Sequence, residues 1–179
     1  MNLLQTSDQD SIAQNALLMK SMKLIEEMRN GLKEKTVGKP FPDFELPLLA
    51  GGTIRRQDLL GKKVLLNFWF ADCQPCIDEM PLLNELKAEF AEGEVIFLAV
   101  TFEPEERVHR FLQQRAFDFM HALNGRGLAK EVGVSFYPST MILDENGVVQ
   151  LAESGAAHAA DPEAAAAWKR RIGGLLRGE

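Results

Sequence analysis

The first 36 residues carry a stripe of apolar positions with the period of an α-helix. Its members recur at spacings of three or four positions: Leu18, Met22, Ile25, Met28 and Leu32. Charged residues lie outside this stripe, among them Lys20, Lys23, Glu27 and Lys33, and three prolines follow at Pro40, Pro42 and Pro47. Because proline cannot continue a helix, we expect one amphipathic helix over residues 7–35, followed by an extended linker.

Two apolar runs in the middle of the chain predict buried strands. Residues 64–70, "VLLNFWF", and residues 94–100, "EVIFLAV", are almost continuously apolar and do not alternate. Such runs are typical of strands that are covered on both faces of a sheet. Residues 75–90, between the two runs, carry apolar side chains at helical spacing. The three segments together predict a βαβ unit with a right-handed crossover.

The flanking segments predict two hairpins and several helices. "LLAGGTIR" can turn at Gly51 and Gly52, and "STMILDENGVVQL" pairs residues 141–143 with 148–151. A final helix begins at Asp161, which can cap it. The segments between the second run and the last hairpin predict a helix over 103–117, a strand within 117–123 and a short helix over 127–133.

Composition narrows the class of protein. The 179 residues are 46% hydrophobic and 26% charged, which is typical of a globular protein of one domain. The net charge of −6 argues against a nucleic-acid partner, because phosphate binding requires a basic surface. No apolar run approaches the ~18 residues that would span a bilayer. The N-terminus lacks the features of a secretory leader, so we expect a cytoplasmic protein, or one of the periplasm or cell envelope if a leader was removed.

The only two cysteines, Cys73 and Cys76, lie in "NFWFADCQPCIDEMP", directly after the first buried strand. The predicted strand and helix place Cys73 at a helix N-terminus, where free N–H groups favour the thiolate that attacks disulfides. Cys76 lies one helical turn further on and can resolve a mixed disulfide on Cys73. We therefore expect an exposed nucleophile followed by a shielded resolving thiol. We expect no metal or other cofactor, because the two thiols are sufficient for disulfide exchange.

In combination, three segments resemble a known family. "FWFADCQPCIDEMP" is similar to the active-site segment of thioredoxin-like thiol–disulfide oxidoreductases of the TlpA/ResA branch, which overlaps with the redoxin and AhpC/TSA group. "GKPFPDFELPLLAGGTIRRQDLLGKKVLLNFWF" resembles the lead-in of that branch, and "YPSTMILDENGVV" its cis-proline segment. The resemblance implies a thioredoxin-like α/β fold: a central mixed β-sheet flanked by helices, with an N-terminal hairpin and a strand–helix insertion. Residues 37–179 would form this domain, and residues 1–36 an extra helical appendage.

The resemblance also implies roles for individual residues. Cys73 would be the attacking thiol and Cys76 the resolving thiol. Pro138 would be a cis-proline facing the dithiol, with the Tyr137 backbone free to pair with a substrate strand. Three further residues are expected beside the dithiol on the substrate-binding side: Gln74, Pro75 and Trp69, the last of which is expected to lie in the core beside the site.

The chain departs from the family pattern at two positions near the dithiol. Asp72 stands where the family often has tryptophan, and a carboxylate there should oppose the Cys73 thiolate unless it turns away as a cap. Asn67 stands where thioredoxin has a buried aspartate, so that proton acceptor is missing. Glu79 matches an acidic residue of the family and is the candidate proton acceptor for Cys76, although a solvated helix residue is the alternative.

Three functions remain open on the sequence alone. The first is a thiol–disulfide oxidoreductase that reduces protein disulfides and receives electrons from an unidentified thiol–disulfide donor protein. The second is a thiol peroxidase, against which Phe70 counts, because peroxiredoxins carry threonine at that position. The third is a non-enzymatic metal carrier, although one CxxC supplies only two soft ligands. The N-terminal helix also suggests a homodimer.

Overall fold

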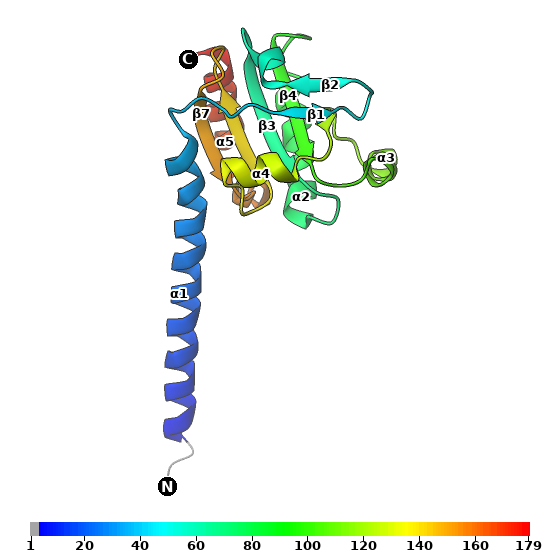
Figure 1. Cartoon of the computed structure of the whole chain (residues 1–179). Coiled ribbons are helices and arrows are strands. Elements are labelled where there is room, and N and C mark those ends of the chain that lie inside the picture. The colour runs from blue at the N-terminus through cyan, green and yellow to red at the C-terminus, as the bar shows by residue number, and fades with distance from the viewer. Residues whose placement is uncertain (1–3) are drawn as a thin grey trace.

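The structure is a computed structural model that describes residues 4–179, apart from the side chains of residues 4–13, 28, 29, 157 and 158. Met28, a member of the predicted apolar stripe, therefore lies outside the described side chains. Figure 1 shows a layered α/β domain from which one long N-terminal helix projects. Among the described residues, no helix is both long and apolar enough to cross a membrane.

The predicted central mixed sheet is confirmed. Its five strands have the order β5-β4-β3-β6-β7. β3 pairs in parallel with β4, and β4 with β5, whereas β6 and β7 are antiparallel. A separate two-stranded hairpin, β1-β2, turns through Gly51 and Gly52 with φ values of 91° and 82°. The strands are β1 Glu45–Pro47, β2 Thr53–Arg55, β3 Lys63–Trp69, β4 Val95–Thr101, β5 Met120–Ala122, β6 Ser139–Leu143 and β7 Val149–Ser154.

Helices cover both faces of the sheet. The α-helices are α1 Leu4–Thr36, α2 Gln74–Lys87, α3 Glu105–Gln114, α4 Arg126–Val132 and α5 Pro162–Arg177, and short 3-10 helices lie at η1 Arg56–Leu59 and η2 Ala157–Ala160. Alternate residues of β3 point to opposite faces, as in any strand. Leu65 and Trp69 pack with α2 and α5, whereas Leu66 and Phe68 pack with α4 and the β1-β2 hairpin. Asn67 shares the face of Leu65, so its polar side chain points toward α2.

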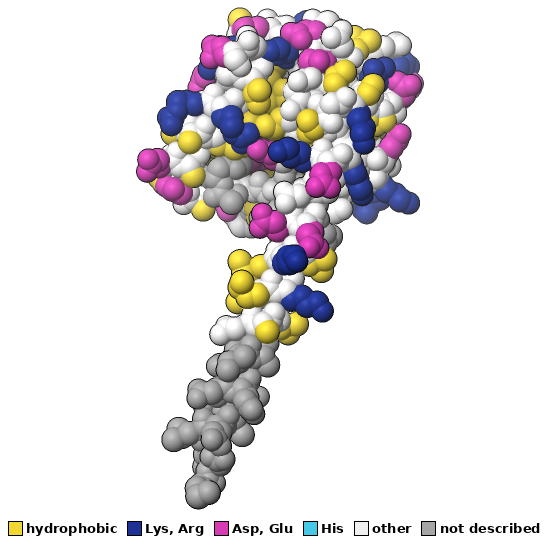
Figure 2. All heavy atoms as spheres, turned by 90° about the vertical axis from the view of Figure 1, so that its left-hand side faces the viewer, with side chains coloured by type: hydrophobic (Ala, Val, Ile, Leu, Met, Phe, Trp, Pro, Cys, Tyr) yellow, Lys and Arg dark blue, Asp and Glu magenta, His cyan; other side chains and the backbone are white. Residues whose placement is uncertain are grey.

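Among the side chains of α1 that the structure describes, those that pack on the domain lie near the C-terminal end of the helix. Leu32 and Thr36 are buried there, and the helix end packs on β7 and α4. Figure 2 shows apolar side chains on the exposed part of the helix beside the domain. Six of them are between 40% and 67% exposed: Leu17, Leu18, Met19, Met22, Leu24 and Ile25.

We expect substitutions in the buried end of α1 to lower the free energy of unfolding more than the same substitutions in its exposed part. In dilute protein, Leu32→Ala should lower the free energy of unfolding by about 2–5 kcal/mol, because it leaves a cavity in the core. Leu18→Ala, the same change on the same stripe, should alter it by less than about 0.5 kcal/mol. Urea unfolding of both variants measures the two values. Equal losses would contradict the packing described for Leu32.

Candidate redox site

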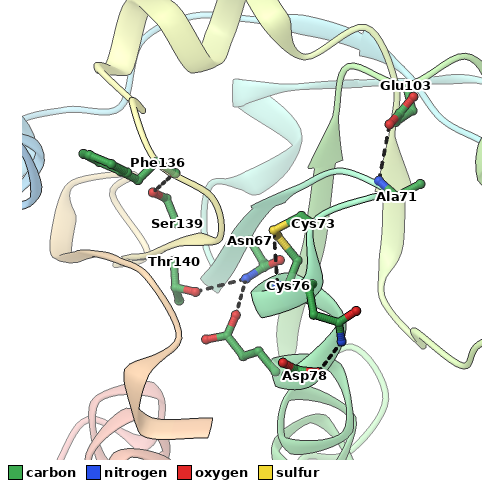
Figure 3. The surroundings of a disulfide bond; sticks show 11 residues. Asn67, Ala71, Cys73, Cys76, Asp78, Glu103, Phe136, Ser139 and Thr140 are labelled. Carbon is green, nitrogen blue, oxygen red and sulfur yellow. Dashed lines mark hydrogen bonds between the residues drawn. A yellow bond between two sulfur atoms is a disulfide. The ribbon is translucent and has the colours of Figure 1, made fainter. Parts of the chain in front are cut away.

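Strand β3 and helix α2 together position the two cysteines. β3 ends at Trp69, and after a short turn Cys73 forms the N-cap of α2. The Cys73 N–H donates to the Phe70 carbonyl oxygen at 3.2 Å and so holds this turn. Pro75 lies in the first helical turn, where a missing N–H leaves no bond unmade. Cys73 and Cys76 are joined by a disulfide at the helix start (Figure 3).

The helix start also supplies a hydrogen bond to the first sulfur. The backbone N–H of Cys76 donates to Cys73 Sγ at 3.2 Å. The free N–H groups and the positive end of the helix dipole at such a position favour negative charge. After reduction of the disulfide, the same N–H can therefore stabilise a thiolate on Cys73, which is the form that attacks another disulfide.

Burial of the cysteines differs from the prediction in one respect. Cys76 is shielded as expected, with 1% of its surface exposed, but Cys73 is only 4% exposed instead of open to solvent. The bond to Cys76 draws the Cys73 sulfur toward the helix start, and both residues belong to the core cluster that contains Trp69 and Met80. The oxidised site therefore offers little sulfur surface.

The loop before β6 lies beside the disulfide. Its Tyr137–Pro138 peptide bond is cis, as predicted. Two hydrogen bonds hold the loop: Ser139 Oγ donates to the Phe136 carbonyl oxygen at 2.7 Å, and the Gly155 N–H donates to the Pro138 carbonyl oxygen at 2.7 Å. Because β6 runs antiparallel to β3, the start of β6 and the end of β3 share one edge of the sheet (Figure 3).

A groove of about 370 Å³ opens between this loop and the start of α2. Its lining is mainly apolar and includes Pro75, Asp78, Phe136, Tyr137, Ala156 and Ala159. Gln74 is exposed next to the groove, and its Nε2 donates to Asp78 Oδ1 at 2.7 Å. Two of the residues expected on the substrate side, Gln74 and Pro75, are thus on the surface beside the disulfide.

Trp69, the third of those residues, is not on the surface. It is 0% exposed, so its side chain cannot contact a docked substrate in this form. Its indole instead packs against three rings from the insertion between β4 and α4: Phe111, Phe117 and His121. Burial lowers the pKa of His121 and so favours the neutral imidazole in this cluster.

A buried polar network lies on the α2 face of β3. Asn67 Nδ2 donates to Glu79 Oε2 at 3.2 Å and to Thr140 Oγ1 at 3.1 Å, so one amide connects three elements (Figure 3). Glu79 is 1% exposed, so the alternative of a solvated helix residue is wrong. A buried carboxyl is costly without hydrogen bonds, and Asn67 supplies one of them. Glu79 follows Cys76 by three residues and therefore lies near it on the helix surface.

An ion-pair network lies on the opposite side of the disulfide turn. Arg107, from α3, forms an ion pair with Asp72, and its Nε lies 3.3 Å from Glu103 Oε2. Glu103 Oε1 in turn accepts a hydrogen bond from the Ala71 N–H at 3.3 Å (Figure 3). Sequence reasoning did not identify Arg107, because its only local signal is a spacing of four residues from Glu103. The pairing turns the Asp72 carboxylate toward a cation.

Three half-buried aromatic rings surround the turn. Phe70 lies 5.4 Å from Tyr137 and 5.6 Å from Phe102, and Phe102 lies 5.7 Å from Tyr137, measured between ring centroids. Burial raises the pKa of the Tyr137 hydroxyl, and the Arg126 guanidinium opposes part of that rise. The hydroxyl is therefore neutral at physiological pH, and it can donate or accept hydrogen bonds at this surface.

The residues that the structure describes contain no group of three histidine, cysteine or acidic side chains placed to hold a metal ion. The third function considered from the sequence, a metal carrier, would thus have to bind its metal with the two cysteines and ligands from elsewhere. At Phe70, the position where peroxiredoxins have threonine, the structure places a ring that packs on Phe102 and Tyr137 and offers no hydroxyl.

Comparison with known proteins agrees with this geometry. Residues 37–152 match the AhpC/TSA family. The thioredoxin-like protein YneN of Bacillus subtilis is 39% identical over 117 residues, which cover 63% of this chain and 68% of YneN. The thiol-disulfide oxidoreductase ResA of Geobacillus thermodenitrificans is 37% identical over 131 residues, which cover 70% of this chain and 75% of ResA.

Solved structures share the same architecture. A Chlorobium tepidum protein assigned as the thiol:disulfide interchange protein DsbE has a TM-score of 0.68 at 27% identity, over 78% of this chain and 97% of its own. The exposed lipoprotein thioredoxin Etrx1 of Streptococcus pneumoniae has a TM-score of 0.59 at 25% identity, over 73% of this chain and 99% of its own. With its CxxC disulfide at the start of α2, the chain belongs to the AhpC/TSA family and, within it, to the thioredoxin-like thiol–disulfide oxidoreductases.

Proposed function

We propose that the protein reduces disulfides of other proteins, with Cys73 as the attacking thiol. The observation that carries this proposal is the hydrogen bond from the Cys76 N–H to Cys73 Sγ at the start of α2. In the reduced protein, the Cys73 thiolate attacks one sulfur of a substrate disulfide, and the other substrate sulfur leaves as a thiolate. The new bond joins Cys73 to the substrate in a mixed disulfide.

Cys76 then completes the exchange. Its thiolate attacks the Cys73 sulfur, the Cys73–substrate bond breaks, and the second substrate thiolate leaves. The substrate gains two electrons, and the protein retains the Cys73–Cys76 disulfide. We propose that Glu79 accepts the proton of Cys76, because it lies one turn along the same helix and is held inside the domain by Asn67.

The substrate segment would bind as an extended strand along the cis-proline loop. The Pro138 carbonyl oxygen is already occupied by Gly155, so the Tyr137 backbone is the proposed pairing edge. The neighbouring groove with Pro75 in its lining can accept an apolar side chain of the same segment. Gln74 would contact the substrate from the exposed start of α2.

Each turnover leaves the protein oxidised, so the cycle requires a reductant. We propose that the donor is another protein with a reactive dithiol. Its two thiols would reduce the Cys73–Cys76 disulfide by the same exchange steps and return both cysteines to the thiol form. We also propose that the protein works outside the cytoplasm, the second of the two locations considered from the sequence. The similarity to an exposed lipoprotein thioredoxin supports this location.

The order of attack can be tested with serine variants. Cys73→Ser should abolish insulin reduction, because it removes the thiolate at the helix start. Cys76→Ser should instead accumulate mixed disulfides on Cys73, because nothing resolves them. Mass spectrometry of complexes trapped in cells would locate the adduct and identify the substrates, the donor and their compartment. Adducts that form on Cys76 in the Cys73→Ser protein would reverse the assignment.

The charges around Asp72 generate a further prediction. Asp72 is 76% exposed at its side chain and pairs with Arg107, so its carboxylate opposes the Cys73 thiolate less than an unpaired one would. Arg107→Met removes the cation and leaves Asp72 and Glu103 unbalanced. It should raise the pKa of the Cys73 thiol by on the order of one unit or less and make the dithiol more reducing.

Asp72→Asn should change the pKa of the Cys73 thiol in the opposite direction and lower it, because it removes the negative charge next to the thiolate. Thiolate absorbance against pH, measured on the reduced proteins, reports both values. Arg110→Met, which removes an exposed cation from the same helix, is the matched control and should change little. An unchanged thiol pKa in Arg107→Met would mean that the ion-pair network has no electrostatic effect on the dithiol, and a lowered thiol pKa would contradict the predicted sign.

We further propose that residues 1–36 are an appendage of a catalytic domain formed by residues 37–179, and that two copies pair through α1. An unsupported helix in water is only marginally stable, and the exposed apolar side chains of α1 lack a partner among the described residues of the chain. Sedimentation equilibrium should give a dimer, and the double change Met22→Glu and Ile25→Glu should give a monomer. A wild-type monomer at all accessible concentrations would contradict the pairing.

A further inference from the structure

The redox site and Arg126 lie at the same edge of the sheet. β3, β4 and β5 are parallel, so the loops that follow them emerge at one edge, which is where open α/β sheets bind their ligands. Cys73 and Phe102 lie in the first two of these loops, and Arg126 begins α4 directly after the third. Tyr137 precedes β6, which is antiparallel to β3, and it therefore lies at this edge as well.

A continuous series of contacts connects Arg126 to the disulfide turn. The Arg126 guanidinium carbon lies 4.4 Å from the centroid of the Phe102 ring. Phe102 contacts both Phe70 and Tyr137, and the Phe70 carbonyl oxygen accepts the hydrogen bond from the Cys73 N–H. We call the three rings Phe70, Phe102 and Tyr137 the aromatic rim of the site. Arg126 is thus an exposed cation at one end of this rim.

The backbone holds Arg126 in a defined place. The Gly125 N–H donates to the Thr101 carbonyl oxygen at 2.8 Å, at the end of β4. A side chain at Gly125 would not fit, because its Cβ would lie 2.3 Å from Val100 Cγ1. Asn124 has a φ of 60°, in the left-handed region that non-glycine residues seldom adopt. The turn that presents Arg126 is therefore closely packed against the end of the sheet.

The fold itself does not neutralise this cation. Within the described part of the chain, no carboxylate forms an ion pair with Arg126, whereas the other arginine close to the turn, Arg107, is paired with Asp72 and Glu103. Arg126 is also the first residue of α4, where the positive end of the helix dipole disfavours a cation. In a protein of net charge −6, this leaves Arg126 without an ion-pair partner among the described residues, at the far end of the aromatic rim from the disulfide turn.

We propose that Arg126 selects protein substrates whose extended segment carries an aspartate or glutamate close to the cysteine that is attacked. The segment would run along Tyr137 and the aromatic rim, and its carboxylate would bind the guanidinium through paired, charge-assisted hydrogen bonds. This assignment names the substrate class of the same site and rests on the proposed function. Arg126 is a residue that determines specificity and takes no part in the exchange of electrons.

Two disulfide-linked peptides would test this role. They share one sequence and differ only in a glutamate or a glutamine near the cysteine, and kcat/KM is measured for both at low ionic strength. The wild-type protein should prefer the glutamate peptide by about twofold to fivefold, the range of an exposed ion pair. The preference should shrink as salt is added, because salt screens exposed charges.

Variants of Arg126 separate charge from packing. Arg126→Met keeps an apolar side chain over Phe102, and the ratio of the two kcat/KM values should fall to about one. Arg126→Glu should reverse the preference. Lys130→Met, which removes an exposed cation one turn further along α4, is the matched control and should keep the wild-type ratio.

The outcomes distinguish this inference from the proposed function. A preference for the glutamate peptide that persists in Arg126→Met, or that is lost equally in Lys130→Met, would overturn the role of Arg126. Wild-type protein that reduces both peptides at the same rate would overturn it as well, while leaving disulfide reduction intact. Failure of the wild-type protein to reduce either peptide, or insulin, would overturn the proposed function together with this inference.

Discussion

The pairing of β3 with a neighbouring strand on each side is the constraint on which the redox site depends. Its register places Asn67 opposite Ala99 of β4 and opposite Thr140 of β6. The same register brings the end of β3, the end of β4 and the start of β6 to one edge of the sheet. The cysteine turn, the ion-pair network and the cis-proline loop come from these three ends. A slip of one residue would turn Asn67 away from α2 and break its hydrogen bond to Glu79.

The two carboxyl groups that flank the disulfide, those of Glu79 and Asp72, have different partners. On the inner side, Glu79 is buried and receives a hydrogen bond from the neutral amide of Asn67. On the outer side, Asp72 is exposed and is balanced by Arg107 from a different helix. The buried carboxyl thus accepts a hydrogen bond from a neutral amide of the sheet, and the exposed carboxyl is paired with a cation of α3.

Local pattern was sufficient to predict most of the scaffold. The continuous apolar runs predicted β3 and β4, and Asp161 was correctly expected to cap the last helix, where its side chain accepts from the Glu163 N–H. The cis bond at Pro138 was inferred from the resemblance to the family. Tertiary contacts were not visible in this way: the pairing of Asp72 with Arg107 spans 35 residues, and the rings of the insertion that pack on Trp69 could not be named, although Trp69 itself was expected in the core. Such contacts depend on how the helices and strands pack together, and they produce no periodic pattern in the sequence.

Helix α1 also governs how the molecule moves through a solvent. Its 33 residues, at a rise of 1.5 Å each, extend for about 50 Å, so a slender rod is joined to a rounded body (Figure 1). Frictional drag grows with such elongation even when mass does not. A single chain of 20.0 kDa would therefore elute from a sizing column ahead of a spherical marker of equal mass. Its hydrodynamic radius describes the shape of the particle and cannot serve as a count of subunits.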